Sequence, residues 1–445
     1  MADLTAANGE VLELARQYNV KFVRLQFTDI FGALKNVAIT VEDLPEVLRH
    51  GMLFDASVVE GIVPYRQTDM VLRPDPRTFV VFPWRPREGA VARLICDLYS
   101  PQGEPFPSCS RLILRRVLAE AQDMGLAPSV ASEVEFFLFR LDEQGQPTTV
   151  THDRAGHCDL TPLDLGENAR RDMVLTLQEM GFETASSHHE LAPGQHEIAL
   201  KAADPLTAAD QLVTFKFVVR TIAQRHSLHA SFMPKPLMEA SGSGLHWHLA
   251  LWRGGQNAFY DPQGEGPLSK VGLSFVAGLL RHVRAFCAIT NPLVNSYKRL
   301  IPSDVAPTYV AWAQDSRNAV IRLSARRGAR TTIEVRHPDP TCNPYLALAL
   351  LLRAGLAGIK EDLVPPPPVP ENMYRADNRR RAELQVTCLP RTLEQALKAM
   401  KEDALVKDTL GEAIFELYYE AKAREWERFL AFVHPWELQE YLIGY

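Results

Sequence analysis

The sequence predicts an α+β protein in which a small N-terminal sheet precedes a larger part built of strands and long helices. Apolar and polar residues alternate over 21–27 and again over 33–39, which is the period of strands. Between them, Asp29–Gly32 carries the composition of a turn. Farther along, residues 208–226 show apolar residues at helical spacing and predict a long helix. Strands gathered early and helices gathered late are typical of the α+β class.

A linker separates the two parts. Residues 100–107 are rich in proline and glycine, so we expect a boundary near residue 105 and domains at 1–105 and 106–445. Before the boundary, the patterns predict helices at 9–19 and 44–49 and strands at 70–72, 79–82 and 91–96. After it, they predict further helices at 111–124, 167–180, 268–289 and 344–360, strands at 130–141, 245–252 and 333–335, and a helical end from residue 393.

Composition excludes several classes of protein. The 445 residues are 46% hydrophobic and 23% charged, which is ordinary for a soluble globular chain. A formal net charge of −6 without a long basic run argues against nucleic acid as a partner. The six cysteines form no Cys-x-x-Cys pair, as expected of reduced thiols in the cytoplasm. The most apolar run, 345–352, is too short to span a membrane, and no signal core is expected.

One stretch, residues 188–197, concentrates two carboxylates and three imidazoles in ten positions. On a flat strand Glu190 and Glu197 would face opposite ways, because an odd spacing reverses the side chain. The turn signal at Pro193–Gly194 would let both carboxylates point into one cavity. Converging carboxylates repel each other unless they share a proton or bind a cation. A polar surface hairpin is the alternative interpretation of this stretch alone.

Three further segments carry polar residues two positions apart, which places them on one face of a strand. These segments are 133–135, 246–248 and 334–336, and apolar residues occupy their opposite faces. Solvated strand faces show the same pattern, so each segment by itself is weak evidence for a functional site. If the three faces join the stretch at 188–197, one cavity holds His246 and five carboxylates, namely Glu133, Glu135, Glu190, Glu197 and Glu334.

Five carboxylates in one cleft require cations. Ligands rich in oxygen and poor in sulfur favour Mg²⁺ or Mn²⁺ over zinc. Several such ions in an acidic cleft suit phosphoryl transfer from a nucleotide, which also needs guanidinium groups for its phosphates. The chain offers four candidates, although structural ion pairs would explain each of them equally well: Arg299, Arg317, Arg322 and Arg336.

The motifs together resemble the signatures of type I glutamine synthetase. The resemblance runs from 24–29 to 434–437, and the absence of a long insertion before Leu389 is similar to the shorter alpha subtype. It implies a β-grasp-like N-terminal domain and a catalytic domain with an antiparallel sheet and helices. It also implies a homo-oligomer, a dodecamer of two hexameric rings with active sites between neighbouring subunits. The motifs that carry it are 54–57, 133–135, 188–197, 243–246, 295–299 and 334–336.

The resemblance also implies ligand sets and roles, with two to three Mg²⁺ or Mn²⁺ ions and ATP as co-substrate. The first metal would take Glu135, Glu190 and Glu197, and the second Glu133, His246 and Glu334. Glutamate would contact Ser241, Gly242, His246, Arg299 and Arg336. ATP would contact His248, Arg317 and Arg322. The catalytic groups would be Arg299, Arg317, Arg336 and Asp55, the last donated by a neighbouring subunit as the base that deprotonates the amine.

The reaction implied is transfer of the ATP γ-phosphoryl group to glutamate, followed by attack of an amine on γ-glutamyl phosphate. Three positions around the expected ammonium pocket depart from the family pattern. The flap glutamate becomes Val305, a hydroxyl residue becomes Val58 and a tyrosine becomes His157. Apolar groups favour an alkyl amine, by about 0.8 kcal/mol per buried CH₂. We therefore predict a small organic amine as substrate, with true glutamine synthetase and a catalytically silent relative as the alternatives.

Overall fold

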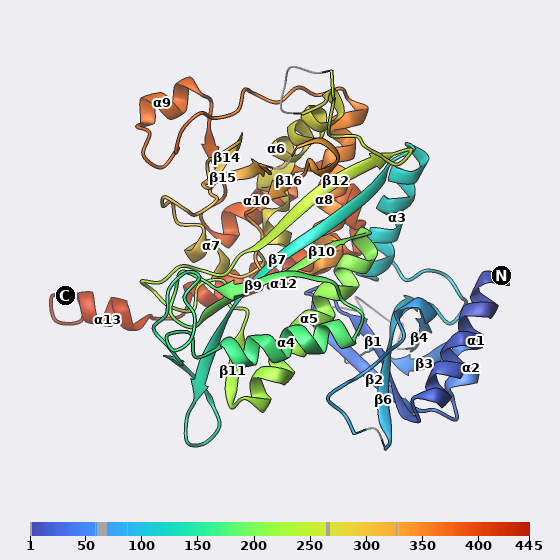
Figure 1. Cartoon of the computed structure of the whole chain (residues 1–445). Helices are drawn as coiled ribbons and strands as arrows, with labels where there is room; N and C mark the ends of the chain where they lie inside the picture. Colours follow the sequence, from blue (N-terminus) through green and yellow to red (C-terminus); the bar gives the residue numbers. More distant parts are fainter. Residues whose placement is uncertain (1, 58, 60–68, 87, 264–267, 326) are drawn as a thin grey trace.

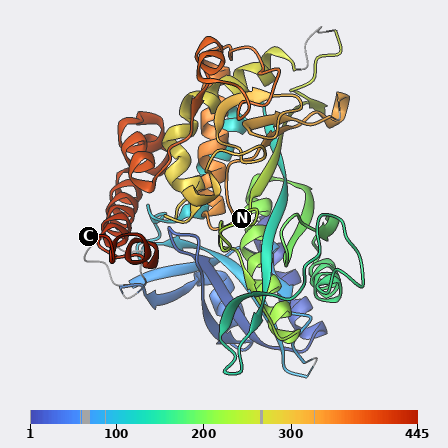
Figure 2. The same cartoon turned by 90° about the vertical axis from the view of Figure 1, so that its left-hand side faces the viewer.

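The computed structural model describes residues 2–57, 59, 69–86, 88–263, 268–325 and 327–445 (Figure 1). Two sheets organise the chain, and each has its own apolar core. The N-terminal sheet lies below the larger one in both views, and the C-terminal helices run along one side in Figure 2. This arrangement confirms the predicted α+β class.

The small sheet has the order β2-β1-β6-β4-β3, with β5 beside β6. Strands β1 and β6 run parallel, whereas β1 and β2 form the predicted hairpin around the Asp29–Gly32 turn. The sequence patterns missed β3, whose four residues are too few to show a period. The elements are α1 (Ala2–Gln17), β1 (Val20–Thr28), β2 (Leu34–Thr40), α2 (Leu44–His50), β3 (Met52–Asp55), β4 (Asp69–Pro74), β5 (Val80–Val81) and β6 (Ala90–Tyr99), with a 3₁₀ turn at Pro76–Thr78.

The large sheet has the order β17-β14-β15-β16-β12-β7-β10-β9, and β8, β11 and β13 pair at its margins. Antiparallel pairing dominates, as expected, but β14 and β15 run parallel to each other. These two short strands are largely buried and lack alternation, so their pattern did not reveal them. The strands are β7 (Ala127–Leu141), β8 (Pro147–Thr151), β9 (Thr184–His189), β10 (Gln195–Ala203), β11 (Leu228–Ser231), β12 (Leu245–Arg253), β13 (Gln256–Asn257), β14 (Tyr309–Ala313), β15 (Ala319–Leu323), β16 (Ile333–Val335) and β17 (Thr387–Cys388).

Helices pack around this sheet and carry most of its apolar core. Helix α6 is the one described helix with the length and composition to cross a membrane, yet 72% of its apolar window is buried inside the molecule. It is therefore a core helix. The helices are α3 (Ser110–Asp123), α4 (Glu167–Glu179), α5 (Pro205–Arg225), α6 (Lys270–Thr290), α7 (Ser296–Arg299), α8 (Pro344–Lys360), α9 (Asn378–Glu383), α10 (Leu393–Glu402), α11 (Ala404–Leu410), α12 (Glu412–Leu430) and α13 (Pro435–Tyr441), with a 3₁₀ turn at Gly328–Arg330.

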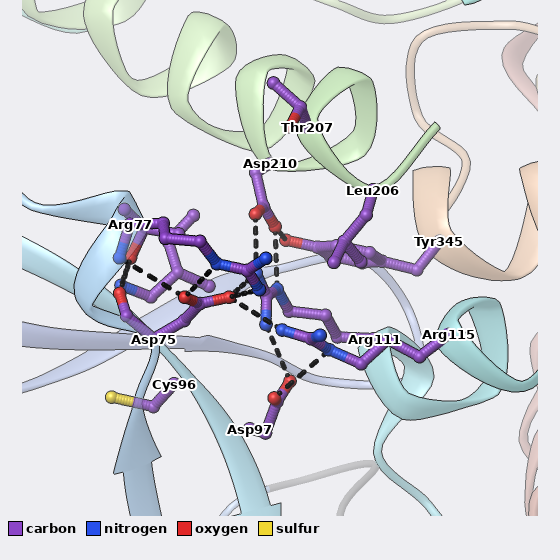
Figure 3. A network of polar contacts seen from close by, with 12 residues as sticks. Asp75, Arg77, Cys96, Asp97, Arg111, Arg115, Leu206, Thr207, Asp210 and Tyr345 are labelled. Atoms are coloured by element: carbon purple, nitrogen blue, oxygen red, sulfur yellow. Dashed lines mark hydrogen bonds and ion pairs between the residues drawn. The ribbon is translucent and has the colours of Figure 1, made fainter. Parts of the chain in front are cut away.

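A buried ion network joins the two parts of the chain (Figure 3). At its centre Arg111 of α3 donates to Asp75 and Asp97 of the N-terminal part, each at 2.9 Å. The same guanidinium donates to both oxygens of Asp210 on α5, at 2.9 and 2.8 Å. The Tyr345 hydroxyl completes the network by donating to Asp210 at 2.7 Å. Because all these groups are buried and paired, they hold the small sheet in one orientation against the large one.

Candidate active site

The candidate site is a cavity of about 690 Å³ over the central strands of the large sheet. Strand register brings its polar residues together, because three pairs stand directly opposite each other on neighbouring strands. Glu135 of β7 faces Glu197 of β10, and Glu133 of β7 faces His246 of β12. His248 of β12 in turn faces Glu334 of β16. Strands β7, β10 and β12 therefore deliver one continuous polar face to the cavity floor, and β16 places Glu334 behind it.

The hairpin at 188–197 supplies the edge of this floor. Strands β9 and β10 are joined by a turn in which the Glu190 N–H donates to the Gln195 carbonyl at 2.7 Å. Gly194 has φ of 67°, and a Cβ there would lie 2.9 Å from the Leu138 carbonyl oxygen, so glycine is required. The turn brings Glu190 and Glu197 to the same cavity, as the sequence predicted.

Two groups of side chains offer ligand atoms that lie within 4.8 Å of one another and share His246. The first consists of Glu133, His246 and Glu334, with His246 Nδ1 at 3.2 Å from Glu133 and 3.9 Å from Glu334. The second consists of Glu135, Glu197 and His246, with His246 Nε2 at 3.9 Å from Glu135. Glu133, His246 and Glu334 are the residues that were predicted from the sequence as ligands of the second metal. Their roles as ligands remain a prediction.

Glu190 lies with a different pair of side chains, although it lines the same cavity. His188 Nε2 is 3.0 Å from Glu190 Oε1, and His157 Nδ1 is 3.6 Å from Glu190 Oε2. These three residues form a third group of possible ligands. Glu190 thus stands apart from Glu135 and Glu197, the two residues predicted to share the first metal with it.

The electrostatics of the floor favour binding of a cation. Burial, reinforced by the charges of Glu133, Glu135 and Glu190, raises the pKa of Glu197 to about 9. Burial alone would also raise the pKa of Glu133, but hydrogen bonds from His246 and His248 hold that pKa well below its usual range. A divalent cation would neutralise these clustered carboxylates, so that Glu197 could stay ionised. The donors, mainly oxygen with one imidazole, fit such an ion.

Arginines lie beside the carboxylates: Arg322 stands opposite Glu334 on the neighbouring strand β15, and Arg336 directly follows β16. Arg299 is buried and held rigidly, because its Nη1 donates to the carbonyls of His337 at 2.7 Å and Pro338 at 3.1 Å. A Cβ on Gly244 would lie 2.4 Å from Arg299 Nη2, so only glycine leaves room for this guanidinium. Arg322 and Arg336 are both paired with the buried carboxylate of Glu334. The fourth arginine, Arg317, is exposed at the cavity edge.

The remaining predicted residues fall in several places. Asp55 is exposed at the end of β3 and does not line the cavity, and Val58 lies outside the described residues. His248 and Glu334 are placed behind the lining, where they contact Glu133 and the arginines respectively. The cavity wall holds the rest, namely Glu133, Glu135, His157, Glu190, Glu197, Ser241, Gly242, His246, Arg299, Val305, Arg317, Arg322 and Arg336.

Sequence patterns missed several lining residues. Gln195 is buried and donates to the Glu135 carboxylate at 3.2 Å, so it orients that oxygen. Its place in the hairpin between two predicted ligands was the signal that could have identified it. Lys235 and Lys298 also line the cavity. Lys298 precedes Arg299 directly, but Lys235 lies in an irregular segment with no motif of its own.

Grouped carboxylates beside oriented guanidiniums are the arrangement that phosphoryl-transfer enzymes using divalent ions require. Comparison with known sequences gives the family. "Glutamine synthetase, catalytic domain" matches residues 107–441, and "Glutamine synthetase, beta-Grasp domain" matches residues 19–101. The chain belongs to the glutamine synthetase family, whose members are ATP-dependent carbon–nitrogen ligases that use divalent metals.

Curated relatives match over the full length. The glutamine synthetase of Clostridium saccharobutylicum is 51% identical over 98% of each chain. That of Thermus thermophilus is 49% identical over 98% of this chain and 99% of its own. Among solved structures, one described as a GmaS/ADP complex has a TM-score of 0.88 at 28% identity, covering 97% of this chain and 99% of its own. A Plasmodium falciparum glutamine synthetase has a TM-score of 0.87 at 24% identity over 98% of each chain and shares the fold.

The predicted preference for a small organic amine is wrong. Full-length relatives about half identical to this chain are glutamine synthetases, which favours ammonia as the nitrogen donor. The structure shows why the sequence argument failed. Val305 is 43% exposed, and His157 lies beside the Glu190 carboxylate. Both side chains are exposed in this chain, so neither is enclosed in an apolar pocket of the kind that an alkyl group would need.

Proposed function

We propose that this protein is a glutamate–ammonia ligase that forms glutamine from glutamate, ammonium and ATP. The observation that supports it most is full-length similarity to glutamine synthetases, at 48–51% identity. A second support is chemical. The cavity groups carboxylates suited to divalent ions with arginines suited to phosphates, and Glu190 keeps a lowered pKa despite burial because His188 donates to it.

The residues of the cavity fall into metal ligands and groups that orient the substrates. Glu133, His246 and Glu334 would hold one divalent ion, and Glu135, Glu190 and Glu197 another, as oxygen-rich sites for Mg²⁺ or Mn²⁺ do. Bound ions neutralise charge on the nucleotide phosphates during transfer. The chain's own arginines orient the reactants, with Arg299 on the glutamate carboxylate and with Arg317, Arg322 and Arg336 toward the phosphates and the γ-carboxyl group. Ser241 and Gly242 border the glutamate, and His248 borders the nucleotide.

The proposed assembly is a dodecamer of two hexameric rings in the cytoplasm. Two features support oligomerisation. Asp55, proposed as the base that deprotonates ammonium, belongs to the N-terminal part and does not line this chain's own cavity, so a neighbouring copy would supply it. Helix α13 projects from the body in Figure 1 and exposes large apolar side chains such as Trp436 and Leu438, a surface that a second copy would cover.

An assay of phosphate release and glutamine formation tests the function. With ATP, glutamate and either Mg²⁺ or Mn²⁺, ammonium is expected to give a higher kcat/KM than methylamine, ethanolamine or isopropylamine. Product is identified by chromatography, so that ATP hydrolysis without ligation is recognised. A higher kcat/KM with an alkyl amine contradicts the proposal, and no turnover with any amine supports a silent relative.

Replacing Arg299 by lysine is expected to raise the KM for glutamate about tenfold or more, because lysine lacks the planar fork that reaches main-chain carbonyls and a carboxylate together. KM values for glutamate and ATP are measured in parallel, and that for ATP should change little. Arg281→Lys is the matched control, since Arg281 forms a surface ion pair with Glu361. An unchanged KM for glutamate would remove Arg299 from the glutamate site.

A further inference from the structure

A second cavity, of about 390 Å³, lies between the N-terminal hairpin and the catalytic part. The β1–β2 turn forms one wall, and α5 together with the segment at Pro340–Thr341 forms the other. The turn is docked firmly, because the Asn343 amide donates to the carbonyls of Asp29 at 3.0 Å and Ile30 at 3.2 Å. The cavity is therefore built into the domain junction, and it is separate from the candidate active site.

Three cations line this cavity, whereas no carboxylate does among the described residues. They are Arg24 of β1 and Lys216 and Arg220 of α5. Lys216 is only 9% exposed, and its ammonium donates to the Pro340 carbonyl at 3.1 Å. Burial, with the charge of Arg220 nearby, lowers the pKa of Lys216 to about 8, so its positive charge is poorly compensated.

Both arginines stack on aromatic rings. The Arg24 guanidinium carbon is 5.7 Å from the centre of the Phe82 ring, and that of Arg220 is 5.2 Å from the centre of Phe232. Within the described part of the chain, neither guanidinium has an ion pair. Burial lowers the pKa of both groups, and Arg85 adds to the effect at Arg24. Aromatic stacking orients a guanidinium while leaving its N–H donors available.

The carboxylates nearest to Lys216 are engaged elsewhere. Asp29 accepts from the N–H groups of Phe31 at 3.0 Å and Ala33 at 2.8 Å, and Lys35 lies 3.7 Å from it. Asp339 accepts from the N–H of Thr341 at 3.0 Å. The ion network around Arg111 provides the contrast, because its arginines, Arg77, Arg111 and Arg115, are all paired with carboxylates (Figure 3). The second cavity holds three cations without any such compensation.

We propose that this cavity binds a small polyanion, an oligophosphate or a polycarboxylate, which bridges the two parts of the chain. Such a ligand supplies the negative charge that Arg24, Lys216 and Arg220 lack, and guanidinium forks match both phosphate and carboxylate oxygens. The volume is at the lower end of the range for small-molecule sites. Arg24 belongs to the N-terminal part and Arg220 to the catalytic part, so both parts contribute to binding.

Calorimetric titration of the full chain with pyrophosphate, and separately with citrate, tests the proposal. The buffer contains no divalent metal, and all proteins carry Arg322→Gln to weaken anion binding in the active site. One binding event per chain is expected with at least one of the anions. Arg24→Gln and Arg220→Gln should each raise its Kd about tenfold or more, since each removes charge-assisted hydrogen bonds. The anion that binds tighter identifies the ligand class.

Arg225→Gln is the matched control, because Arg225 lies on the same helix, carries the same charge and does not line the cavity. The Kd of the Arg225→Gln variant for the bound anion should equal that of the Arg322→Gln protein without this second substitution. Absence of binding by both anions overturns the proposal, as does a Kd that Arg24→Gln and Arg220→Gln leave unchanged. The two arginines lie in different parts of the chain, so a folding defect in one variant does not prevent the test with the other.

Discussion

Replacing Glu197 by glutamine is expected to reduce kcat/KM for glutamine formation about 10³-fold or more, while making the metal-free protein more stable at alkaline pH. The loss of activity follows from removing a carboxylate assigned to a divalent ion, a change that forfeits about 4 kcal/mol of transition-state stabilisation. The gain in stability follows from the pKa of about 9 at Glu197. Glutamine keeps the shape of the protonated side chain and carries no charge.

The direction of the pH effect follows from proton binding. The Glu197 pKa is about 9 in the folded chain, against an ordinary value of 4.5. Between these values the folded state binds more protons than the unfolded state, so stability falls as pH rises. The contribution is fully present below about pH 4.5 and is lost as pH rises through 9, by up to about 1.4 kcal/mol per unit. The glutamine variant should lack this part of the decline.

Urea denaturation in EDTA at pH 6 and pH 9 measures the effect, and addition of Mg²⁺ or Mn²⁺ measures the metal dependence. Divalent ions should restore the stability of the parent at pH 9 and should stabilise the variant much less. Glu179→Gln is the control, because Glu179 is exposed at the end of α4. Equal pH dependence in parent and Glu197→Gln would show that Glu197 is not forced to hold a proton.

The second large effect is structural. Arg111→Met should lower the free energy of unfolding by about 3–5 kcal/mol, because it leaves the buried Asp210 carboxylate without its paired cation. The side chain of Arg111 is 4% exposed and pairs with Asp75, Asp97 and Asp210. Methionine keeps much of the volume, so the loss reports the charges more than a cavity.

The control for Arg111→Met is Arg77→Met, which removes a guanidinium from the same network. Arg77 is 67% exposed and lies 2.9 Å from Asp75. An exposed pair contributes about 0–1 kcal/mol, so this variant should unfold close to the parent. Both are measured by urea denaturation at one protein concentration, since assembly stabilises the folded chain. If the two variants lost similar amounts of unfolding free energy, the junction between the two parts of the chain would not depend on burial of Arg111.

Local patterns were sufficient for many elements. Alternation identified β1, β2, β7 and β12 within a few residues of their ends. Asn343–Pro344 also predicted the start of α8, where the Asn343 side chain accepts from the N–H groups of Tyr345 at 3.0 Å and Leu346 at 3.3 Å. Short buried strands such as β14 and β15 gave no such signal, because a run of five mostly apolar residues fits a strand or a helix equally.

The sequence by itself determined which faces of β7, β10 and β12 are acidic or basic, since a period of two follows from the chain geometry of a strand. The motifs also determined the family. Only the tertiary structure decided the register that sets His246 between two carboxylate groups, and the separation of Glu190 from them. It alone decided that Arg111 meets Asp210, 99 residues away, and that Arg24, Lys216 and Arg220 share a cavity. Such contacts join distant segments, so no local period records them, and they form only when the sheets and helices pack.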